Sequence, residues 1–389
     1  MIEDIAFIGF LLIAFFLINK KWAKSRGFSF LQAKWLFALW FYHLSICLVF
    51  YRYLLVHGGD SWRYWNIPPI SEGSSDLWLN LFGTGTYFMY WINYPFSQTA
   101  GLGYLSGTFL YASISYFGFL LAFDLLNSSF TKSSKKYFPH IALFILFLPN
   151  VHFWTAGVGK ESLLWLGLML VLVGVYQFPN RIIFIVIGLL LTLMVRPIQG
   201  LVLSVSVLMV LPFHKTLIPY RKKLIPISIF LIFSIFAYRF ILGSLIYGFN
   251  LKWIGDILDW QTQYLASFGG ASSINMSDYS WFEKFNTIIF RPFIWESKGF
   301  WTFAAGVENT FTLAFFILGL WSLYQLKFQF KIPLYLWTVL IYGILLSFLF
   351  SITLNNLGII MRMKSIYLPF FSFIALHLFY EVAKVKEEK

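Results

Sequence analysis

The stretch PNVHFWTAGVGKESL, residues 149–163, separates two apolar runs, each of them short for a helix that crosses a bilayer. Its charged residues therefore lie at or near the edge of the hydrocarbon, where ionised groups are costly and indicate a functional site. Lys160 and Glu161 are adjacent, so on a helix they point about 100° apart and need not pair with each other. The alternative is an interfacial loop in which Lys160 snorkels and Trp154 joins an aromatic belt. Snorkelling explains the lysine but not the glutamate.

The composition of the 389-residue chain is typical of an integral membrane protein. Hydrophobic residues make up 59% and charged residues only 12%, whereas soluble domains carry about 25% charged residues. The net charge of +13 would suit nucleic acid, but in a polytopic chain an excess of Lys and Arg in short loops sets the orientation. No nucleic-acid-binding motif appears, so the composition predicts membrane lipids and no nucleic acid as partners.

Apolar segments predict an all-α fold, a polytopic transmembrane bundle of about 11 spans in a single domain, residues 1–389. The spans are placed at 4–19, 34–56, 103–126, 140–154, 162–178, 182–196, 199–213, 224–247, 308–326, 332–352 and 357–380. Two large extracytoplasmic loops, 57–102 and 248–306, contain amphipathic stretches that predict interfacial or re-entrant pieces.

The distribution of basic residues predicts the orientation of these spans. Eighteen of the 29 Lys and Arg residues, including every compact basic cluster, fall on one side, which the positive-inside rule assigns to the cytoplasm. The N-terminus is therefore expected outside and the C-terminus inside. The first span lacks a cleavage site and is expected to be retained. The outside loops combine acidic, basic, amide and aromatic residues, so we expect the functional site there.

Asp60 is the first candidate catalytic residue, because it follows two glycines directly after the second span. A carboxylate held at the membrane surface can act as a general base toward a sugar hydroxyl, and Glu161 is the second candidate for this role. The alternative is structural, since Asp60 or Ser61 suits the N-cap of the next helix. Both roles can coexist.

Arginines at the ends of outer segments indicate an anionic substrate. Arg196, Arg291 and Arg362 each offer a planar fork of donors that binds phosphate oxygens, and together with Lys160 they would suit a diphosphate. For each arginine alone, pairing with a carboxylate or snorkelling is the alternative. Lys160, Glu161 and Arg196 lie at the outer ends of consecutive spans, so one polar cluster is predicted. The candidate substrate-binding residues are Arg63, Tyr64, Trp154, Lys160, Arg196, Arg291, Glu296, Asn356 and Arg362.

Five segments resemble a known class of enzyme: HGGDSWRYW (57–65), FWTAGVGKES (153–162), RPIQ (196–199), FRPFIWE (290–296) and NNLGIIMRMKSIYLP (355–369). With them the chain resembles bacterial O-antigen polymerase-like and exopolysaccharide polymerase proteins, and more loosely the GT-C-type glycosyltransferases that use lipid-linked sugars. This resemblance implies the bacterial inner membrane and an undecaprenyl-diphosphate-linked glycan as donor. It implies no cofactor, nucleotide sugar or metal, and other polysaccharide-assembly proteins as partners.

The resemblance also implies roles for individual residues. The arginines and Lys160 would stabilise the leaving diphosphate, and aromatic residues would stack on sugar rings. Asp60 matches the first-loop acid of GT-C enzymes in position, whereas polymerases and ligases rely more on Arg and His, so both subclasses stay open. The aromatic candidates are Trp62, Tyr64, Trp65 and Trp154.

Two other classes of protein compete with this prediction. A transporter or flippase of a lipid-linked or anionic substrate would also use intramembrane charges and broken helices, although no inverted repeat is visible. A scaffold protein would not need charged residues at helix ends. A further candidate, His152, either titrates or hydrogen-bonds near Lys160 or is simply amphipathic. The single cysteine, Cys47, excludes an intrachain disulfide.

Overall fold

The computed structural model describes residues 2–67, 77–130, 137–233, 263, 272–276 and 278–387. These residues are helical, and the β-structure among them is an isolated bridge between Ser273 and Asn356. The predicted all-α fold is therefore confirmed. The helices group into two compact units, a division that the sequence did not predict: residues 1–174 with 181–201, called unit 1, and residues 175–180 with 202–389, called unit 2.

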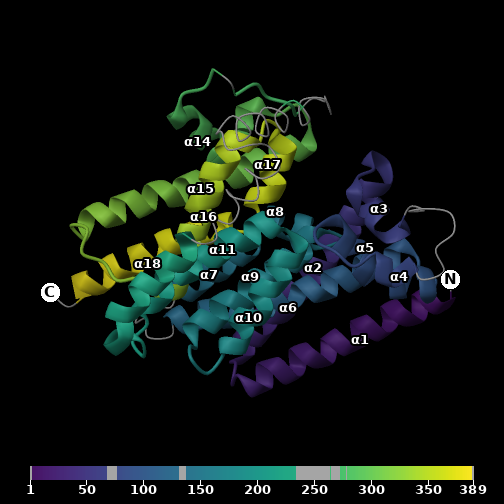
Figure 1. Cartoon of the computed structure of the whole chain (residues 1–389), viewed down its shortest axis with the longest axis horizontal. Helices are drawn as coiled ribbons and strands as arrows, with labels where there is room; N and C mark the ends of the chain where they lie inside the picture. The colour runs from purple at the N-terminus through teal and green to yellow at the C-terminus, as the bar shows by residue number, and fades with distance from the viewer. Residues whose placement is uncertain are drawn as a thin grey trace. The chain divides into compact units, whose positions relative to one another are not determined.

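The helices follow in chain order (Figure 1). They are α1 (Ile2–Ser25), α2 (Phe30–His57), α3 (Asp60–Asn66), α4 (Leu77–Asn80), α5 (Thr86–Tyr94), the π-helical turn η1 (Pro95–Thr99), α6 (Tyr104–Phe130), α7 (Tyr137–Leu146), α8 (Pro149–Thr155), α9 (Lys160–Tyr176), α10 (Ile182–Val195), α11 (Pro197–Val210), the 3₁₀ turns η2 (Leu211–Phe213) and η3 (Ile218–Tyr220), α14 (Trp281–Phe290), the 3₁₀ turn η4 (Ile294–Glu296), α15 (Phe300–Gln325), α16 (Leu334–Thr353), α17 (Leu357–Lys364) and α18 (Leu368–Glu387).

The chain is a multi-pass membrane protein, with fewer full-length spans in its described part than the predicted 11. Seven helices there are long and apolar enough to cross a membrane, and eight if the bent pair Pro197–Phe213 and Ile218–Phe233 counts as one span. Two predicted spans are shorter helices, because α9 has 17 residues and α10 has 14, against the ~20 that a straight span needs.

The last predicted span, 357–380, is wrong at its start. Helix α17 ends at Lys364, and α18, which is long enough to cross the membrane, begins at Leu368. The predicted span 224–247 continues beyond the described residues, which end there at Phe233. Most of the first half of the loop 248–306, with its amphipathic stretch 252–268, also lies outside them.

Helix α6 is the centre of unit 1, since 78% of its most apolar stretch is buried, against 17% in α1. Polar contacts join α1 to both ends of α6. The Asp4 carboxylate accepts hydrogen bonds from the Gly103 N–H (2.7 Å) and the Ser106 hydroxyl (2.6 Å), and Asp124 forms an ion pair of 2.7 Å with Arg26. The two helices therefore run parallel, as the predicted topology requires.

In unit 2, α15 and α18 lie side by side (Figure 1). Gly319 allows the close approach, because a Cβ there would lie 3.1 Å from the Cβ of Ala375. Helix α16 packs against α18 and α14, and α17 packs against α14 and α16. The short helices α14 and α17 therefore place Arg291, Asn356 and Arg362 beside the longer helices of unit 2.

The predicted orientation can be tested with single cysteines at opposite ends of unit 1. Gln98, in η1, is exposed at the end where α3 lies, and Ser25 is exposed at the basic end of α1. On a Cys47→Ala background, we expect an impermeant maleimide to label Gln98→Cys in intact cells and Ser25→Cys only after permeabilisation. Labelling of Ser25→Cys alone in intact cells would reverse the orientation.

Candidate functional site

The candidate site residues fall into two groups, one in each unit. Unit 1 contains Asp60, Arg63, Tyr64, Trp154, Lys160, Glu161 and Arg196, and unit 2 contains Arg291, Glu296, Asn356 and Arg362. The predicted convergence of all the arginines on one diphosphate involves both units, and it stays a prediction. Each group is therefore described by its own geometry.

The stretch 149–163 forms a buried turn between two helices. Pro149 is the first residue of α8, where a proline fits without losing a helical hydrogen bond. The bend at 156–159 packs on α2, and a Cβ at Gly157 would lie 2.2 Å from the Phe50 ring, so only glycine fits. The Ser162 hydroxyl closes the bend by donating to the carbonyls of Thr155 and Gly157, both at 2.7 Å.

The first pair held by this turn is Glu161 with Arg196. An Arg196 guanidinium nitrogen lies 2.5 Å from Glu161 Oε1, and the side chains are 20% and 2% exposed. The predicted proximity of these residues is therefore observed. A carboxylate so buried and paired is well placed to orient the arginine, since the pair holds both side chains in one geometry.

The Lys160 side chain points in a different direction from that of Glu161, as expected for adjacent positions on a helix. Its amine donates to the Thr86 hydroxyl at 3.1 Å and lies 5.5 Å from the centre of the Tyr64 ring. Gly85, at φ +67°, turns the chain beside this amine, and its N–H donates to the Met194 carbonyl at 2.8 Å. The ends of α5 and α10 are thereby joined next to Lys160.

Helix α3 places Asp60 at its first position, and the predicted N-cap role is wrong for both candidates. The N-cap residue is Gly59, with no side-chain cap. Ser61 is buried instead, where its hydroxyl donates to the Val158 carbonyl at 2.5 Å and shares a hydrogen bond of 2.7 Å with the Tyr104 hydroxyl. Asp60 is exposed, and its charge suits the positive end of the helix.

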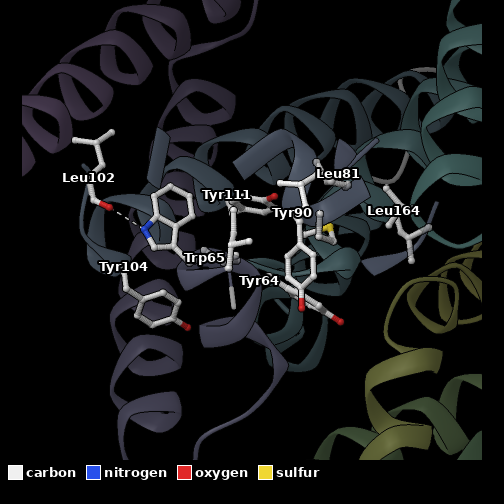
Figure 2. Close-up of a cluster of buried hydrophobic side chains, with 13 residues drawn as sticks. Tyr64, Trp65, Leu81, Tyr90, Leu102, Tyr104, Tyr111 and Leu164 are labelled. Carbon is white, nitrogen blue, oxygen red and sulfur yellow. Dashed lines mark hydrogen bonds between the residues drawn. The ribbon is translucent and has the colours of Figure 1, made fainter. Parts of the chain in front are cut away.

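Tyr90 connects α3 electrostatically to α5. Burial raises the pKa of Tyr90, while Arg63 opposes that shift, and Asp60 and Tyr87 add to it. The Tyr64 and Tyr90 rings lie 6.4 Å apart, and Figure 2 shows them as neighbours. Asp60 and Arg63 therefore act on Tyr90, whose ring neighbours that of Tyr64, which Lys160 approaches from α9.

The predicted sugar-stacking role is wrong for Trp65. Its side chain is 1% exposed, its indole N–H donates to the Leu102 carbonyl at 2.8 Å (Figure 2), and it packs against Gly107. Trp62, in contrast, is 48% exposed. Trp154 is partly exposed and lies edge-on to Phe153. Tyr64 is also buried, at 5% exposure, so Trp62 and Trp154 remain as the candidate aromatic surfaces for sugar stacking.

In unit 2, Arg291 pairs with a carboxylate, which is the alternative that the sequence left open. It lies 2.6 Å from Glu296 and donates to the Tyr279 hydroxyl at 3.2 Å. The other Glu296 oxygen accepts from the Phe293 N–H at 2.8 Å. Both residues therefore stabilise the turn between α14 and α15.

Asn356 has a structural role as the N-cap of α17. Its side-chain oxygen accepts from the N–H groups of Gly358 (2.9 Å) and Ile359 (3.2 Å) and from the Ser272 hydroxyl (3.1 Å). Such a cap stabilises a helix by about 1 kcal/mol. Arg362 lies near the end of α17 and is partly exposed.

Several buried titratable residues escaped the sequence analysis, among them His43 and Glu308. Glu308 is 6% exposed within the apolar helix α15, and His43 is fully buried within α2. The available signal was an ionisable residue inside a predicted span, which is a functional candidate by default. Across the described part of the chain, no group of three or more His, Cys, Asp or Glu residues is placed to hold a metal ion.

Lys364 is also buried, with its side chain at the C-terminal end of α14. Its amine donates to the carbonyls of Ile289 and Arg291, both at 2.9 Å, where a cation complements the helix dipole. Burial lowers the pKa of Lys364 to about 7, and Glu308 opposes this shift. The amine therefore titrates near neutral pH.

This titration predicts that the protein becomes more stable as the pH rises above 7. An unfolded lysine, with a pKa of about 10.4, keeps its proton when folded Lys364 has lost it. The unfolded state then binds more protons, so the free energy of unfolding should rise by about 2 kcal/mol between pH 7 and pH 9. Thermal unfolding in detergent measures this rise. Lys364→Met should abolish it, and an unchanged rise in that variant would assign the effect to another group.

No family model matches this chain, and it matches no curated protein and no solved structure.

Proposed function

We propose that unit 1 carries out glycosyl transfer from a polyprenyl-diphosphate-linked glycan at the extracytoplasmic face of a bacterial inner membrane, in surface polysaccharide assembly. The observation that carries this proposal is the set of charged residues around α3, α5 and the α8–α9 turn. There an exposed carboxylate, Asp60, acts on Tyr90, and a partly exposed ammonium, Lys160, lies over the ring of Tyr64, which neighbours Tyr90. The reaction requires a base for the acceptor hydroxyl and cations for the diphosphate, both close to the lipid that carries the donor.

The cations of this cluster are suited to the diphosphate. Lys160 carries positive charge over the Tyr64 ring, Arg63 acts on Tyr90, and Arg196 is oriented by Glu161. As the anomeric carbon separates from the diphosphate oxygen, negative charge develops on the leaving group, and positioned donors stabilise it most at that stage. Lys160 approaches from the start of α9, where the helix dipole adds to its charge.

Asp60 is the base in this proposal. It accepts the proton of the acceptor hydroxyl as that oxygen bonds to the anomeric carbon, and the bond from this carbon to the diphosphate oxygen breaks. Glu161 is less suited to this step, because it is 2% exposed and already paired with Arg196. Trp62 and Trp154 are the aromatic surfaces that remain for sugar rings. Other polysaccharide-assembly proteins are the expected partners.

A transporter or flippase of a lipid-linked or anionic substrate is the second candidate. The observation that favours it is the bent pair Pro197–Phe213 and Ile218–Phe233, whose two parts meet at 97°. Broken helices line substrate sites in many transporters. The paired charges at the ends of α9 and α10 favour the enzyme, because they gather at one end of unit 1.

Deletion of the gene, followed by sizing of surface glycans and lipid-linked intermediates, separates these two functions. We expect long chains to disappear and single lipid-linked repeat units to accumulate at the extracytoplasmic face, where an added glycosidase can cleave them in spheroplasts. Accumulation only at the cytoplasmic face would favour the flippase. Unchanged chain length and unchanged intermediates would remove both functions.

A further inference from the structure

Two histidines from different helices meet inside unit 1. His43 of α2 and His152 of α8 are both fully buried. Their Nδ1 atoms lie 2.8 Å apart, within hydrogen-bond distance. His43 lies in the candidate span Phe30–His57, and His152 lies in the candidate span Phe138–Thr155, which α7 and α8 form together. An ionisable pair within such spans is a functional candidate by default.

The Nε2 atoms of the two histidines, which do not take part in the contact between the rings, face oxygen atoms. His152 Nε2 lies 2.6 Å from the Leu146 carbonyl, so it carries a hydrogen and donates. His43 Nε2 lies 2.9 Å from the Ser115 hydroxyl and 3.1 Å from the Ala112 carbonyl. The Ser115 hydroxyl is itself 3.1 Å from the same carbonyl. It can therefore point either to His43 or to Ala112.

Counting hydrogens gives one complete arrangement for the neutral pair. Each neutral imidazole has one N–H. His152 uses its hydrogen at Nε2, so its Nδ1 accepts, and His43 must donate from Nδ1. His43 Nε2 is then an acceptor, which the Ser115 hydroxyl satisfies. The result is a directed chain from Ser115 through His43 and His152 to the Leu146 carbonyl.

A second arrangement is complete when the pair holds one additional hydrogen. With a hydrogen on His43 Nε2, this atom donates to the Ala112 carbonyl, and the Ser115 hydroxyl turns toward the same carbonyl. The Nδ1 hydrogen between the rings stays shared. A second added proton would bring the pair to four ring hydrogens, one of them on each Nδ1 atom, and would place two N–H groups against each other at 2.8 Å. The geometry thus accommodates one added proton and not two.

We propose that His43 and His152 form a proton-binding site inside the bundle, which takes up a single proton from water at His43 Nε2 as the Ser115 hydroxyl rotates. The ligand is a proton: the N–H bond forms as an O–H bond of a hydronium ion breaks, which leaves a water molecule. This inference is independent of the proposed glycosyl transfer.

The surroundings suit a cation shared between two rings. Phe119 stacks on His152 at 4.1 Å, and Tyr42 meets the same ring edge-on at 4.8 Å. Tyr116 stacks on His43 at 6.2 Å, and aromatic faces attract cations. Tyr42 of α2 and Tyr116 of α6 are titratable neighbours, and the Tyr116 hydroxyl donates to Asn19 at 2.6 Å.

Solid-state NMR of ¹⁵N-histidine-labelled protein in liposomes tests the site between about pH 4 and pH 9, the range around the ordinary histidine pKa. We expect a coupling across the hydrogen bond between the two Nδ1 atoms. We also expect two ring N–H groups per pair at high pH and three at low pH. His43→Asn and His152→Asn assign the signals. His140→Gln, which replaces an exposed histidine of α7, should leave the pair unchanged.

Ser115→Ala keeps the test decisive even where a histidine variant fails to fold. It removes the donor to neutral His43 Nε2, whereas the charged pair keeps the Ala112 carbonyl as a partner. Losing one hydrogen bond should raise the ratio of charged to neutral pairs about two- to tenfold at a given pH. No coupling between the Nδ1 atoms, uptake of two protons, no uptake, or an unchanged ratio in Ser115→Ala would each overturn the proposal.

Discussion

Asp60→Asn is expected to lower glycan assembly by about 10²- to 10⁴-fold, the typical contribution of a general base, while protein amount and thermal stability stay the same. The amide keeps the shape of the side chain but cannot accept the proton of the acceptor hydroxyl. Stability should not change, because Asp60 is exposed and Gly59, not Asp60, is the N-cap of α3. Polymer length and yield in a deletion strain complemented with each variant measure the effect.

Glu3→Gln is the matched control for this experiment. Glu3 is an exposed carboxylate in the first turn of α1, next to Asp4, which binds the start of α6. The control should therefore retain wild-type polymer, and Asp60→Glu should recover part of the activity. Wild-type yield in Asp60→Asn would remove Asp60 from the mechanism and return the search for a base to Glu161.

The sequence predicted the helical class and the contact between Glu161 and Arg196, because both depend on local rules. Apolar length indicates a span, and the ends of antiparallel neighbours meet. The burial of Ser61 and Trp65 could not be predicted in this way. Both belong to a segment that the sequence predicts to be a polar loop, yet both are buried in α3, where they donate hydrogen bonds to the carbonyls of Val158 and Leu102.

The same limit explains the missed histidine pair. His43 and His152 are 109 positions apart, and each one alone resembles an ordinary amphipathic residue of a membrane helix. Only the packing of α2 against α8 brings them together. The break before Leu368 was also missed, although Pro369, at the second position of α18, is a signal that a new helix begins there.

The buried ion pair should respond to substitution in a different way from Asp60. Glu161→Gln leaves the Arg196 charge without its carboxylate in a largely buried site, since these side chains are 2% and 20% exposed. Removing one partner of a buried pair costs about 3–5 kcal/mol, so a large loss of thermal stability is expected. Lys160→Gln is the control, because the adjacent ammonium is partly exposed and bonds to a neutral hydroxyl. Its loss should stay below about 1.5 kcal/mol.

A double-mutant cycle separates the pair from general damage to unit 1. In Glu161→Gln with Arg196→Gln, no uncompensated charge remains, so the double variant should be more stable than the sum of the two single losses predicts. Arg196→Lys keeps the charge but loses the planar fork, and an intermediate loss is expected. If the two single losses simply add, Glu161 does not hold Arg196, and the proposed orientation of this arginine toward a diphosphate loses its support.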